Sequence, residues 1–339
     1  MSQMQGWAAT EAGKPLSLQT FDLGALGAEE VEVAVDYCGI CHSDLSMIKN
    51  EWGMSRFPFV PGHEVIGRVT ALGEHAKGLA MGQRVGIGWT ASSCMHCKQC
   101  LSGHQNLCPE GLATIGGGHQ GGFADKVRSH WAWAVPLPEG IDLASAGPLL
   151  CGGITVLKPF LSYRVSPGAR VGVVGIGGLG HMALKFARAW GCEVTAFTSN
   201  AAKADEARAF GAHNIVSSRD ASAIKAIAGS LDMLLVTVNV PLDWNALLGT
   251  LAPMGRMHVV GAVLEPIPVP IFTLMMGERE VSSSPTGSPV DIATLLDFAT
   301  RHDIRPQVEM FPMDQVNEAL RHLADGNARY RIVLEAKAS

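Results

Sequence analysis

The stretch Ala169-Arg-Val-Gly-Val-Val-Gly-Ile-Gly-Gly-Leu-Gly180 decides the fold of the second half of the chain. It opens with a short apolar, β-branched run that is typical of a buried parallel strand. The run leads directly into Gly-x-Gly-x-x-Gly, a pattern that permits a tight turn, a close approach of the backbone to a pyrophosphate and tight packing of the next helix. Free amides and the helix dipole at that helix N-terminus favour an anion. We therefore predict a dinucleotide-binding loop formed by Gly175, Gly177, Gly178, Leu179 and Gly180.

Alternating strands and helices continue beyond this loop. Apolar residues recur at helical spacing up to Gly191, and a β-branched run follows at 193–197. Further helices are expected at 201–210, 221–228 and 242–251, and further strands at 214–216, 231–238 and 256–260. Strands that alternate with helices in this way predict a doubly wound parallel sheet of the Rossmann type.

The end of the second predicted strand bears on the choice of dinucleotide. NAD-binding sheets carry an Asp or Glu there for the ribose hydroxyls, but the segment Phe197-Thr-Ser-Asn-Ala-Ala-Lys203 has no carboxylate. Hydrogen bonds from Thr198, Ser199 and Asn200 and the charge of Lys203 suit a ribose phosphate instead. The segment favours NADP, unless Lys203 only solvates a helix face.

Length and composition limit the classes of protein. The 339 residues suggest about two domains, and a chain that is 47% hydrophobic and 17% charged folds into a globule. The formal net charge is -5 and no run of Lys and Arg occurs, which argues against nucleic acid as a partner. The most apolar late stretch, 257–277, is broken by Glu265 and three prolines. We expect a cytoplasmic protein with no membrane partner.

Four cysteines crowd into fifteen residues as Cys94, Cys97, Cys100 and Cys108. Two-residue gaps let successive thiolates converge on one ion at about 2.3 Å, and the longer gap returns the fourth thiolate. Because four thiolates fill a tetrahedron, this spacing predicts a structural zinc. An iron–sulfur cluster uses similar spacings, and unligated core cysteines are the remaining alternative.

A second, dispersed set comprises Cys41, His63 with Glu64, and Cys151. Two thiolates and one imidazole would hold a catalytic zinc and leave one position for water or substrate. Taken singly, each residue also suits a structural role, since a lone Cys is often a packed hydrophobe. Spacing alone leaves this choice open.

The order of these motifs resembles the zinc-dependent medium-chain dehydrogenases over essentially the whole chain. Cys38-Gly-Ile-Cys-His-Ser-Asp-Leu45 and Gly177-Gly-Leu-Gly-His-Met182 look most like the cinnamyl alcohol dehydrogenase branch. The resemblance implies that Cys41, His63 and Cys151 bind the catalytic zinc and that Glu64 is able to approach it. It also implies that the four crowded cysteines hold the structural zinc.

The resemblance further implies two domains and a homodimer. A β-rich, GroES-like catalytic domain would comprise residues 1–147 and 293–339. A Rossmann NADP-binding domain, 148–292, would be inserted between them.

Other site residues are carried over from the family one by one. Ser43 matches a hydroxyl that passes a proton, although a turn-capping role is the alternative, and Asp44 matches the carboxylate that orients a zinc-bound imidazole. Many relatives have His where this chain has Ser46, which assigns the last proton step to water or the cofactor ribose. Trp52, Trp89 and Phe272 fall where relatives line the substrate pocket, and ordinary core packing is the alternative for each.

These features predict a zinc-dependent oxidoreductase that transfers hydride between NADP(H) and primary alcohols or aldehydes. Aromatic walls favour broad reduction of aromatic or allylic aldehydes. A polyol dehydrogenase is one alternative, although relatives of that kind typically carry a carboxylate in place of Cys151. A non-catalytic protein that binds zinc or NADPH is the other.

Overall fold

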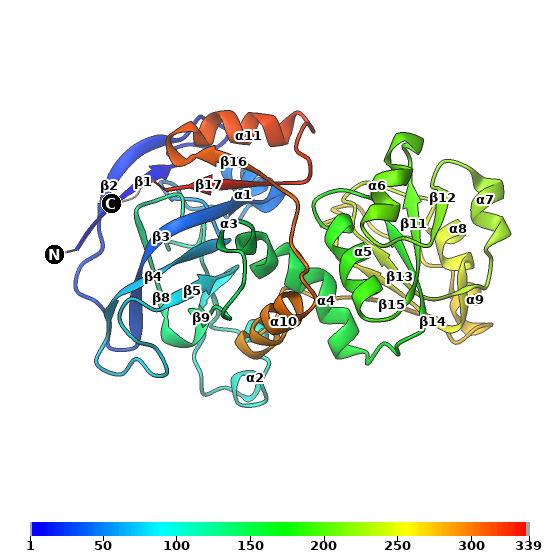
Figure 1. The fold of residues 1–339 in the computed structure, drawn as a ribbon, viewed down its shortest axis with the longest axis horizontal. Coiled ribbons are helices and arrows are strands. Elements are labelled where there is room, and N and C mark those ends of the chain that lie inside the picture. Colours follow the sequence, from blue (N-terminus) through cyan, green and yellow to red (C-terminus); the bar gives the residue numbers. More distant parts are fainter. Residues whose placement is uncertain (1, 337–339) are drawn as a thin grey trace. The chain divides into compact units, whose positions relative to one another are not determined.

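The computed structural model describes residues 2–336, and the chain forms two compact units (Figure 1). The first unit contains the residues up to Ile154 together with those from Thr286 onward, and the second is Thr155–Pro285. The second unit is therefore an insertion in the first. Its two boundaries lie a few residues inside the expected boundaries at 148 and 292.

The first unit is built on a seven-stranded sheet with the order β16-β17-β3-β4-β5-β9, in which β8 also pairs with β3. Its pairings are antiparallel except for β16 with β17. Smaller two-stranded sheets join β1 with β2 and β6 with β7. The strands of this unit are β1 (Gln3–Ala8), β2 (Ser17–Asp22), β3 (Glu30–Ile40), β4 (Val65–Leu72), β5 (Arg84–Ile87), β6 (Thr90–Ser92), β7 (Leu112–Ala113), β8 (Lys126–His130), β9 (Val135–Pro136), β16 (Val308–Pro312) and β17 (Arg331–Glu335).

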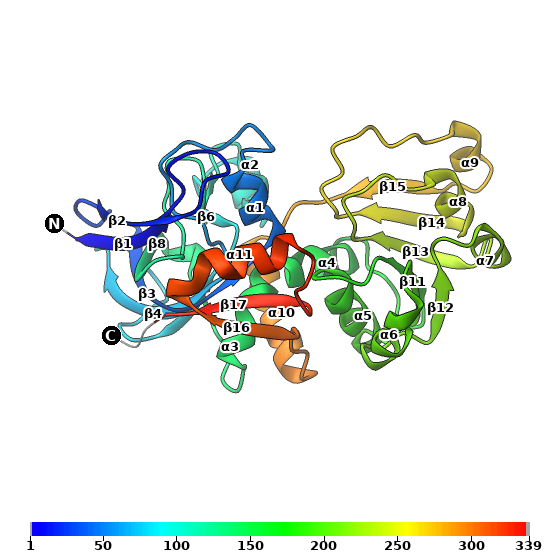
Figure 2. The same ribbon diagram turned by 90° about the horizontal axis from the view of Figure 1, so that it is seen from above.

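Helices of the first unit are short and cover parts of this sheet. Helix α11 lies across β17 and β16 (Figure 2) and buries Val316, Ala319 and Leu320 on one face. Burying a Val or Leu side chain such as those of Val316 and Leu320 stabilises the fold by roughly 1.5–3 kcal/mol. The helices are α1 (His42–Ile48), α2 (Lys98–Leu101), η1 (Gln105–Leu107), η2 (Trp131–Trp133), α3 (Leu143–Ala146), η3 (Gly147–Leu150), α10 (Pro289–Arg301), η5 (Met313–Gln315) and α11 (Val316–Ala324), and α4 (Gly152–Ser162) runs across the first boundary.

The second unit is a six-stranded parallel sheet with the order β12-β11-β10-β13-β14-β15 (Figure 2). The strand order reverses between β10 and β13, which is the point where parallel sheets bind ligands at their carboxyl ends. Its strands are β10 (Arg170–Val174), β11 (Glu193–Thr198), β12 (Asn214–Ser217), β13 (Leu231–Val236), β14 (Leu251–Val259) and β15 (Glu280–Ser283). Its helices are α5 (Gly180–Ala189), η4 (Ala201–Lys203), α6 (Ala204–Ala209), α7 (Ala221–Ala226), α8 (Trp244–Gly249) and α9 (Ile271–Met275).

The predicted doubly wound sheet is confirmed, with two elements that the sequence did not indicate. The sixth strand, β15, is a short edge strand, and α9 follows a proline-rich loop. Within residues 2–336 no single helix has the length and hydropathy of a membrane span, and only the bent pair Leu143–Leu150 and Gly152–Ser162 passes that test when joined across 56°.

Candidate functional site

Cys41, His63 and Cys151 come together in the interior of the first unit. Cys41 caps α1, His63 precedes β4, and Cys151 lies between η3 and α4. The two sulfur atoms are 3.9 Å apart, and His63 Nε2 lies 3.2 Å from Cys151 Sγ. The dispersed set therefore converges, with Glu64 in the same group.

This donor set fits a zinc ion. Two sulfur atoms that each lie about 2.3 Å from a tetrahedral ion are separated by about 3.8 Å, close to the observed 3.9 Å between Cys41 and Cys151. Both cysteines are free of disulfides. The hydrogen bond from Cys151 lowers the pKa of the Cys41 thiol well below its usual range, and the charge of Arg331 acts in the same direction. A thiolate is the form that binds metal.

Asp44 holds the ligands in place from a fully buried position on α1. Its Oδ2 accepts a hydrogen bond from the Cys41 N–H (2.8 Å), and its Oδ1 accepts one from the Gly62 N–H (3.0 Å). The same Oδ1 lies 3.0 Å from His63 Nδ1. This contact directs Nε2 of the imidazole toward Cys151, as a carboxylate does behind many zinc-bound histidines.

Glu64 is fully buried and forms an ion pair with Arg331, which is also buried. Burial raises the pKa of Glu64 to about 6, although the charge of Arg331 opposes the shift. Glu64 Oε2 has no hydrogen-bond partner among the described residues. A Cβ atom on Gly39 would lie 2.0 Å from this oxygen, so only glycine fits beneath it. Glu64 belongs to the group of residues whose ligand atoms lie close enough to hold one ion.

The hydroxyls of α1 have different partners. Ser43 Oγ lies 3.7 Å from Cys41 Sγ, which places it at the cluster. Ser46 is buried, and its hydroxyl donates a hydrogen bond to Glu51 Oε2 (2.7 Å). Ser46 thus connects the interior of α1 with a half-exposed carboxylate.

Two of the three predicted pocket aromatics lie beside the cluster. The rings of Trp89 and His63 are edge to face with centroids 5.0 Å apart, and Trp52 contacts Trp89 at 6.1 Å. Phe272 belongs to the second unit, where it is 72% exposed on α9. Within the first unit, the structure groups Trp52 and Trp89 with the ligand cluster.

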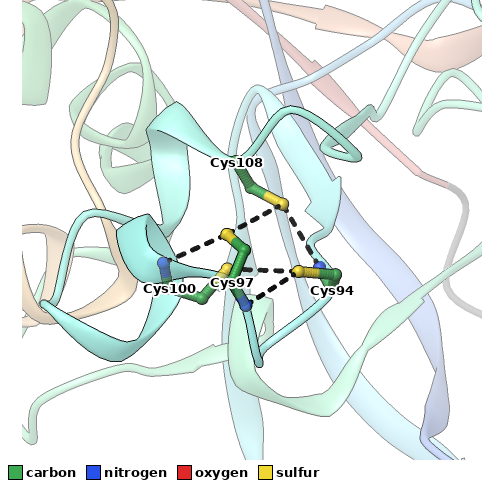
Figure 3. A group of neighbouring side chains, drawn as sticks. All are labelled: Cys94, Cys97, Cys100 and Cys108. Atoms are coloured by element: carbon green, nitrogen blue, oxygen red, sulfur yellow. Dashed lines mark hydrogen bonds between the residues drawn. The ribbon is translucent and has the colours of Figure 1, made fainter.

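The four crowded cysteines form a separate group around α2 and η1 (Figure 3). The sulfur atoms of Cys94 and Cys100 are 3.9 Å apart, as are those of Cys97 and Cys108. Backbone N–H groups of Cys94, Cys97 and Cys100 donate to sulfur atoms of the same group, at 3.3–3.5 Å. Such donors stabilise thiolates, and the equal sulfur separations fit one tetrahedral zinc ion with no open position.

The glycines of the loop between β10 and α5 in the second unit differ in their local geometry. Gly175 has a φ of +90°, and a Cβ atom on Gly180 would lie 1.8 Å from the Gly175 carbonyl oxygen. A Cβ atom on Gly177 would meet nothing within 4 Å. The loop therefore leaves open space at Gly177, as the approach of a pyrophosphate requires, and Gly178 and Leu179 lead from it into α5.

A cavity of about 780 Å³ lies at the carboxyl ends of β10, β11 and β12. Thr198 and Asn200 also bond within their own turn, and Lys203 Nζ donates to the Ile176 carbonyl (2.9 Å). Five predicted cofactor residues line this cavity, namely Gly175, Thr198, Ser199, Asn200 and Lys203.

Three residues near these sites were missed by reasoning from sequence. Ser218 and Arg219 line the nucleotide cavity from the end of β12, and Arg331 holds Glu64. A charged residue at the head of the apolar strand Arg331-Ile-Val-Leu334 was the available signal for Arg331. Ser218 and Arg219 carry no comparable signal, because their place depends on the pairing of β12 with β11.

Two family models match the chain. The Alcohol dehydrogenase GroES-like domain matches residues 27–139, and the Zinc-binding dehydrogenase matches residues 178–301. Together they account for the β-rich first unit and much of the second. The predicted fold class is thereby confirmed.

Individual relatives extend over nearly the whole chain. Aldehyde reductase AdhA from Synechocystis sp. is 56% identical over 331 residues, which cover 98% of each chain. A cinnamyl alcohol dehydrogenase structure from Sorghum bicolor superimposes with a TM-score of 0.94 at 40% identity, again over 98% of each chain. The Helicobacter pylori enzyme of that name, solved with NADP(H), gives a TM-score of 0.91 at 29% identity over 99% of each chain.

Proposed function

The chain belongs to the zinc-dependent medium-chain alcohol dehydrogenases, on their cinnamyl alcohol dehydrogenase-like branch, and on this premise we propose that it transfers hydride between NADP(H) and primary alcohols or aldehydes. We propose aromatic and allylic aldehydes as the preferred substrates, reduced with broad specificity. The observation that carries the proposal is the buried group of Cys41, His63 and Cys151 with Trp89 packed against its imidazole.

Cys41, His63 and Cys151 are proposed to hold the catalytic zinc, and Asp44 to fix the imidazole. Two thiolates would balance the charge of a divalent ion, and three protein ligands would leave one position for a neutral carbonyl oxygen. When bound, zinc polarises that carbonyl and NADPH supplies the hydride. Arg331 keeps Glu64 paired at the edge of the cluster. Cys94, Cys97, Cys100 and Cys108 are proposed to bind a second, structural zinc.

Ser43 is proposed to pass the proton that accompanies hydride transfer. Its hydroxyl is the one on α1 that lies at the cluster, 3.7 Å from Cys41 Sγ. A hydroxyl both donates and accepts, so it is suited to move a proton without itself holding a charge.

NADP(H) is the proposed cofactor. The Helicobacter pylori relative was solved with NADP(H), and in this chain the cavity beside the glycine loop is lined by Lys203 and Arg219 but by no carboxylate. A carboxylate there would repel a ribose phosphate, whereas the two cations attract it. We place the pyrophosphate against Gly175, Gly177, Gly178, Leu179 and Gly180, and the ribose phosphate near Thr198, Ser199, Asn200 and Lys203.

Trp52, Trp89 and Phe272 are proposed as walls of the substrate pocket. The edge-to-face contact of Trp52 with Trp89 places two aromatic rings at an angle next to His63. Aromatic and allylic carbonyl compounds pack well on such rings.

Turnover with a defined panel of substrates tests this function. Oxidation of NADPH and of NADH by the zinc-loaded protein is measured with cinnamaldehyde, benzaldehyde or a ketose, each at the same concentration. We expect rapid NADPH oxidation with both aromatic aldehydes and little with the ketose. Preference for the ketose would favour a polyol dehydrogenase, and no oxidation by protein with two zinc ions would favour a non-catalytic binding protein.

We also propose a homodimer formed through the second unit. Strand β15 ends its sheet, and large apolar side chains are exposed on and around the nearby α9, namely Leu264, Ile271, Met275 and Met276. An open strand edge beside an apolar patch is typical of a contact surface. Sedimentation should give twice the chain mass, and Met276→Asp should produce monomers; a monomeric wild-type protein would contradict the proposal.

A cytoplasmic location is proposed from the thiols. All eight cysteines are free and Cys38 and Cys192 are buried without a disulfide partner, which suits a reducing compartment. Cell fractionation tests this.

A further inference from the structure

Arg219 lines the nucleotide cavity but is not one of the cofactor residues predicted from the sequence. It follows β12, whose Ser217 pairs with Thr198 of β11. The Ser218 N–H donates to the Thr198 carbonyl (3.0 Å), which brings the two strand ends together. Arg219 thus lines the same cavity as Ser199 and Lys203 although it is distant from them in sequence.

The charge of Arg219 is uncommitted. Among residues 2–336 no hydrogen bond or ion pair engages its guanidinium, and its side chain is exposed. The adjacent carboxylate of Asp220 caps α7 through the N–H groups of Ser222 and Ala223. No carboxylate lines the cavity. The charged side chains that line the cavity are therefore two cations, Arg219 and Lys203.

Lys203 is less available than Arg219. Its ammonium already donates to the Ile176 carbonyl in the glycine loop (2.9 Å). A lysine in this position links the turn after β11 to the loop after β10, and so supports the shape of the whole nucleotide site. A guanidinium, in contrast, presents a planar fork of donors that matches phosphate oxygens in pairs.

We propose that Arg219 determines the preference for NADP(H) over NAD(H) by binding the phosphate on the 2′ oxygen of the adenosine ribose, while Lys203 secures the glycine loop. This inference rests on the proposed use of NADP(H). It assigns a specificity-determining role to a residue that follows β12, in addition to the polar residues at the end of β11.

Binding of two nucleotides that differ only in this phosphate tests the role without turnover. Calorimetry compares adenosine 2′,5′-bisphosphate with adenosine 5′-monophosphate on zinc-loaded wild type, Arg219→Gln, Arg219→Lys and Arg208→Gln. Arg208 is the matched control, because it is a nearby arginine that pairs with Asp205 and does not line the cavity.

We expect Arg219→Gln to weaken the bisphosphate about tenfold, the value of one charged hydrogen bond, and to leave the monophosphate unchanged. Arg219→Lys should restore part of the loss, Arg208→Gln should resemble wild type, and KM should rise for NADPH but not for NADH in Arg219→Gln. Unchanged bisphosphate binding by Arg219→Gln, or equal losses for both nucleotides, would overturn the proposed role of Arg219 but not the proposed use of NADP(H). A wild-type protein with no preference for the bisphosphate would overturn the proposed cofactor as well.

Discussion

Asp44 organises the ligand cluster through a single buried carboxylate. It accepts hydrogen bonds from the Cys41 and Gly62 backbone and contacts His63 Nδ1. The role of Asp44 behind the imidazole was implied only by family resemblance, since an Asp three residues after a Cys is equally typical of a helix cap. In the structure the same side chain completes the capping box of α1 and contacts the imidazole.

Asp44→Asn should loosen the catalytic metal without affecting the four-cysteine group. The amide replaces one acceptor with a donor, so the Cys41 N–H or the imidazole loses its partner. We expect about 10–100-fold weaker zinc retention at one of two sites, measured by competition with a chelator. Asp36→Asn, in which a partly exposed carboxylate loses its pairing with Arg68, should retain zinc like wild type. Equal zinc retention by both variants would remove Asp44 from the site.

Cys151→Ser should reduce the zinc content from two ions per chain to one. Serine has a similar shape but a hydroxyl that stays protonated at neutral pH, so it is a poor zinc ligand. We expect loss of turnover with an unchanged circular dichroism spectrum and unchanged NADPH binding. The zinc content is measured by atomic emission, and two retained ions with full activity would show that Cys151 is not a ligand.

Arg331 and Arg219 mark what sequence could not reveal at this scale. Cysteine spacing is local, so the four-cysteine group could be predicted from the chain itself. Arg331 meets Glu64 only because β17 pairs with β3, and Arg219 meets the cavity only because β12 pairs with β11. Contacts that depend on long-range strand pairing have no local pattern.

At the scale of elements, the loop between β10 and α5 gives the most specific prediction, because its glycines differ in the space available to a Cβ atom. An added Cβ would lie 1.8 Å from a backbone oxygen at Gly180 but would meet nothing within 4 Å at Gly177. Gly180→Ala should therefore lower the free energy of unfolding by about 1–3 kcal/mol through steric strain.

Gly177→Ala provides the matched comparison. It should unfold at nearly the wild-type denaturant concentration but bind NADPH more weakly, because its methyl group occupies the space that the pyrophosphate needs. Urea unfolding and NADPH fluorescence separate the two effects. Wild-type NADPH binding by Gly177→Ala would contradict the placement of the pyrophosphate.

His258 on β14 gives the second unit a stability that depends on pH. Its ring nitrogens contact Ser282 (2.9 Å) and Ser284 (3.1 Å). Burial lowers its pKa from 6.5 to about 4, and the charge of Arg256 adds to the shift. The unfolded chain therefore takes up the proton first as the pH falls below 6.5, and the folded state loses stability down to about pH 4.

Comparison with His258→Gln isolates this contribution from other titrating groups. The difference between the free energies of unfolding of wild type and His258→Gln should fall by about 2 kcal/mol when the pH is lowered from 7.5 to 5. Urea unfolding at the two pH values measures it. A constant difference would show that His258 is not held neutral.

The elements themselves were predictable where patterns were strong. The β-branched runs of β10 and β11, the apolar run of β13 and the glycine loop identified the parallel sheet. Strand β15 was missed because Glu280-Val-Ser-Ser283 is short and polar, which is typical of an edge strand. Helix α9 was missed because it follows three prolines in a segment without helical periodicity.

At the scale of the whole molecule, the first unit is discontinuous in sequence, because the second unit is inserted between its two segments. The first unit needs β16 and β17 from the end of the chain to extend the sheet that β3 begins. The sequence alone indicated two domains from length, and the discontinuous arrangement came only from family resemblance, because no local signal marks a strand that returns to a distant sheet. Zinc ligands and the nucleotide loop fall in different units as a result.

The central claim is direct hydride transfer from NADPH to a carbonyl carbon. Its most direct test is to incubate the zinc-loaded protein with cinnamaldehyde and NADPH that carries deuterium at both C4 positions, and to analyse the product by mass spectrometry. We predict cinnamyl alcohol with one deuterium on its carbinol carbon. Consumption of NADPH without deuterium in the alcohol, or no alcohol at all, would contradict the claim.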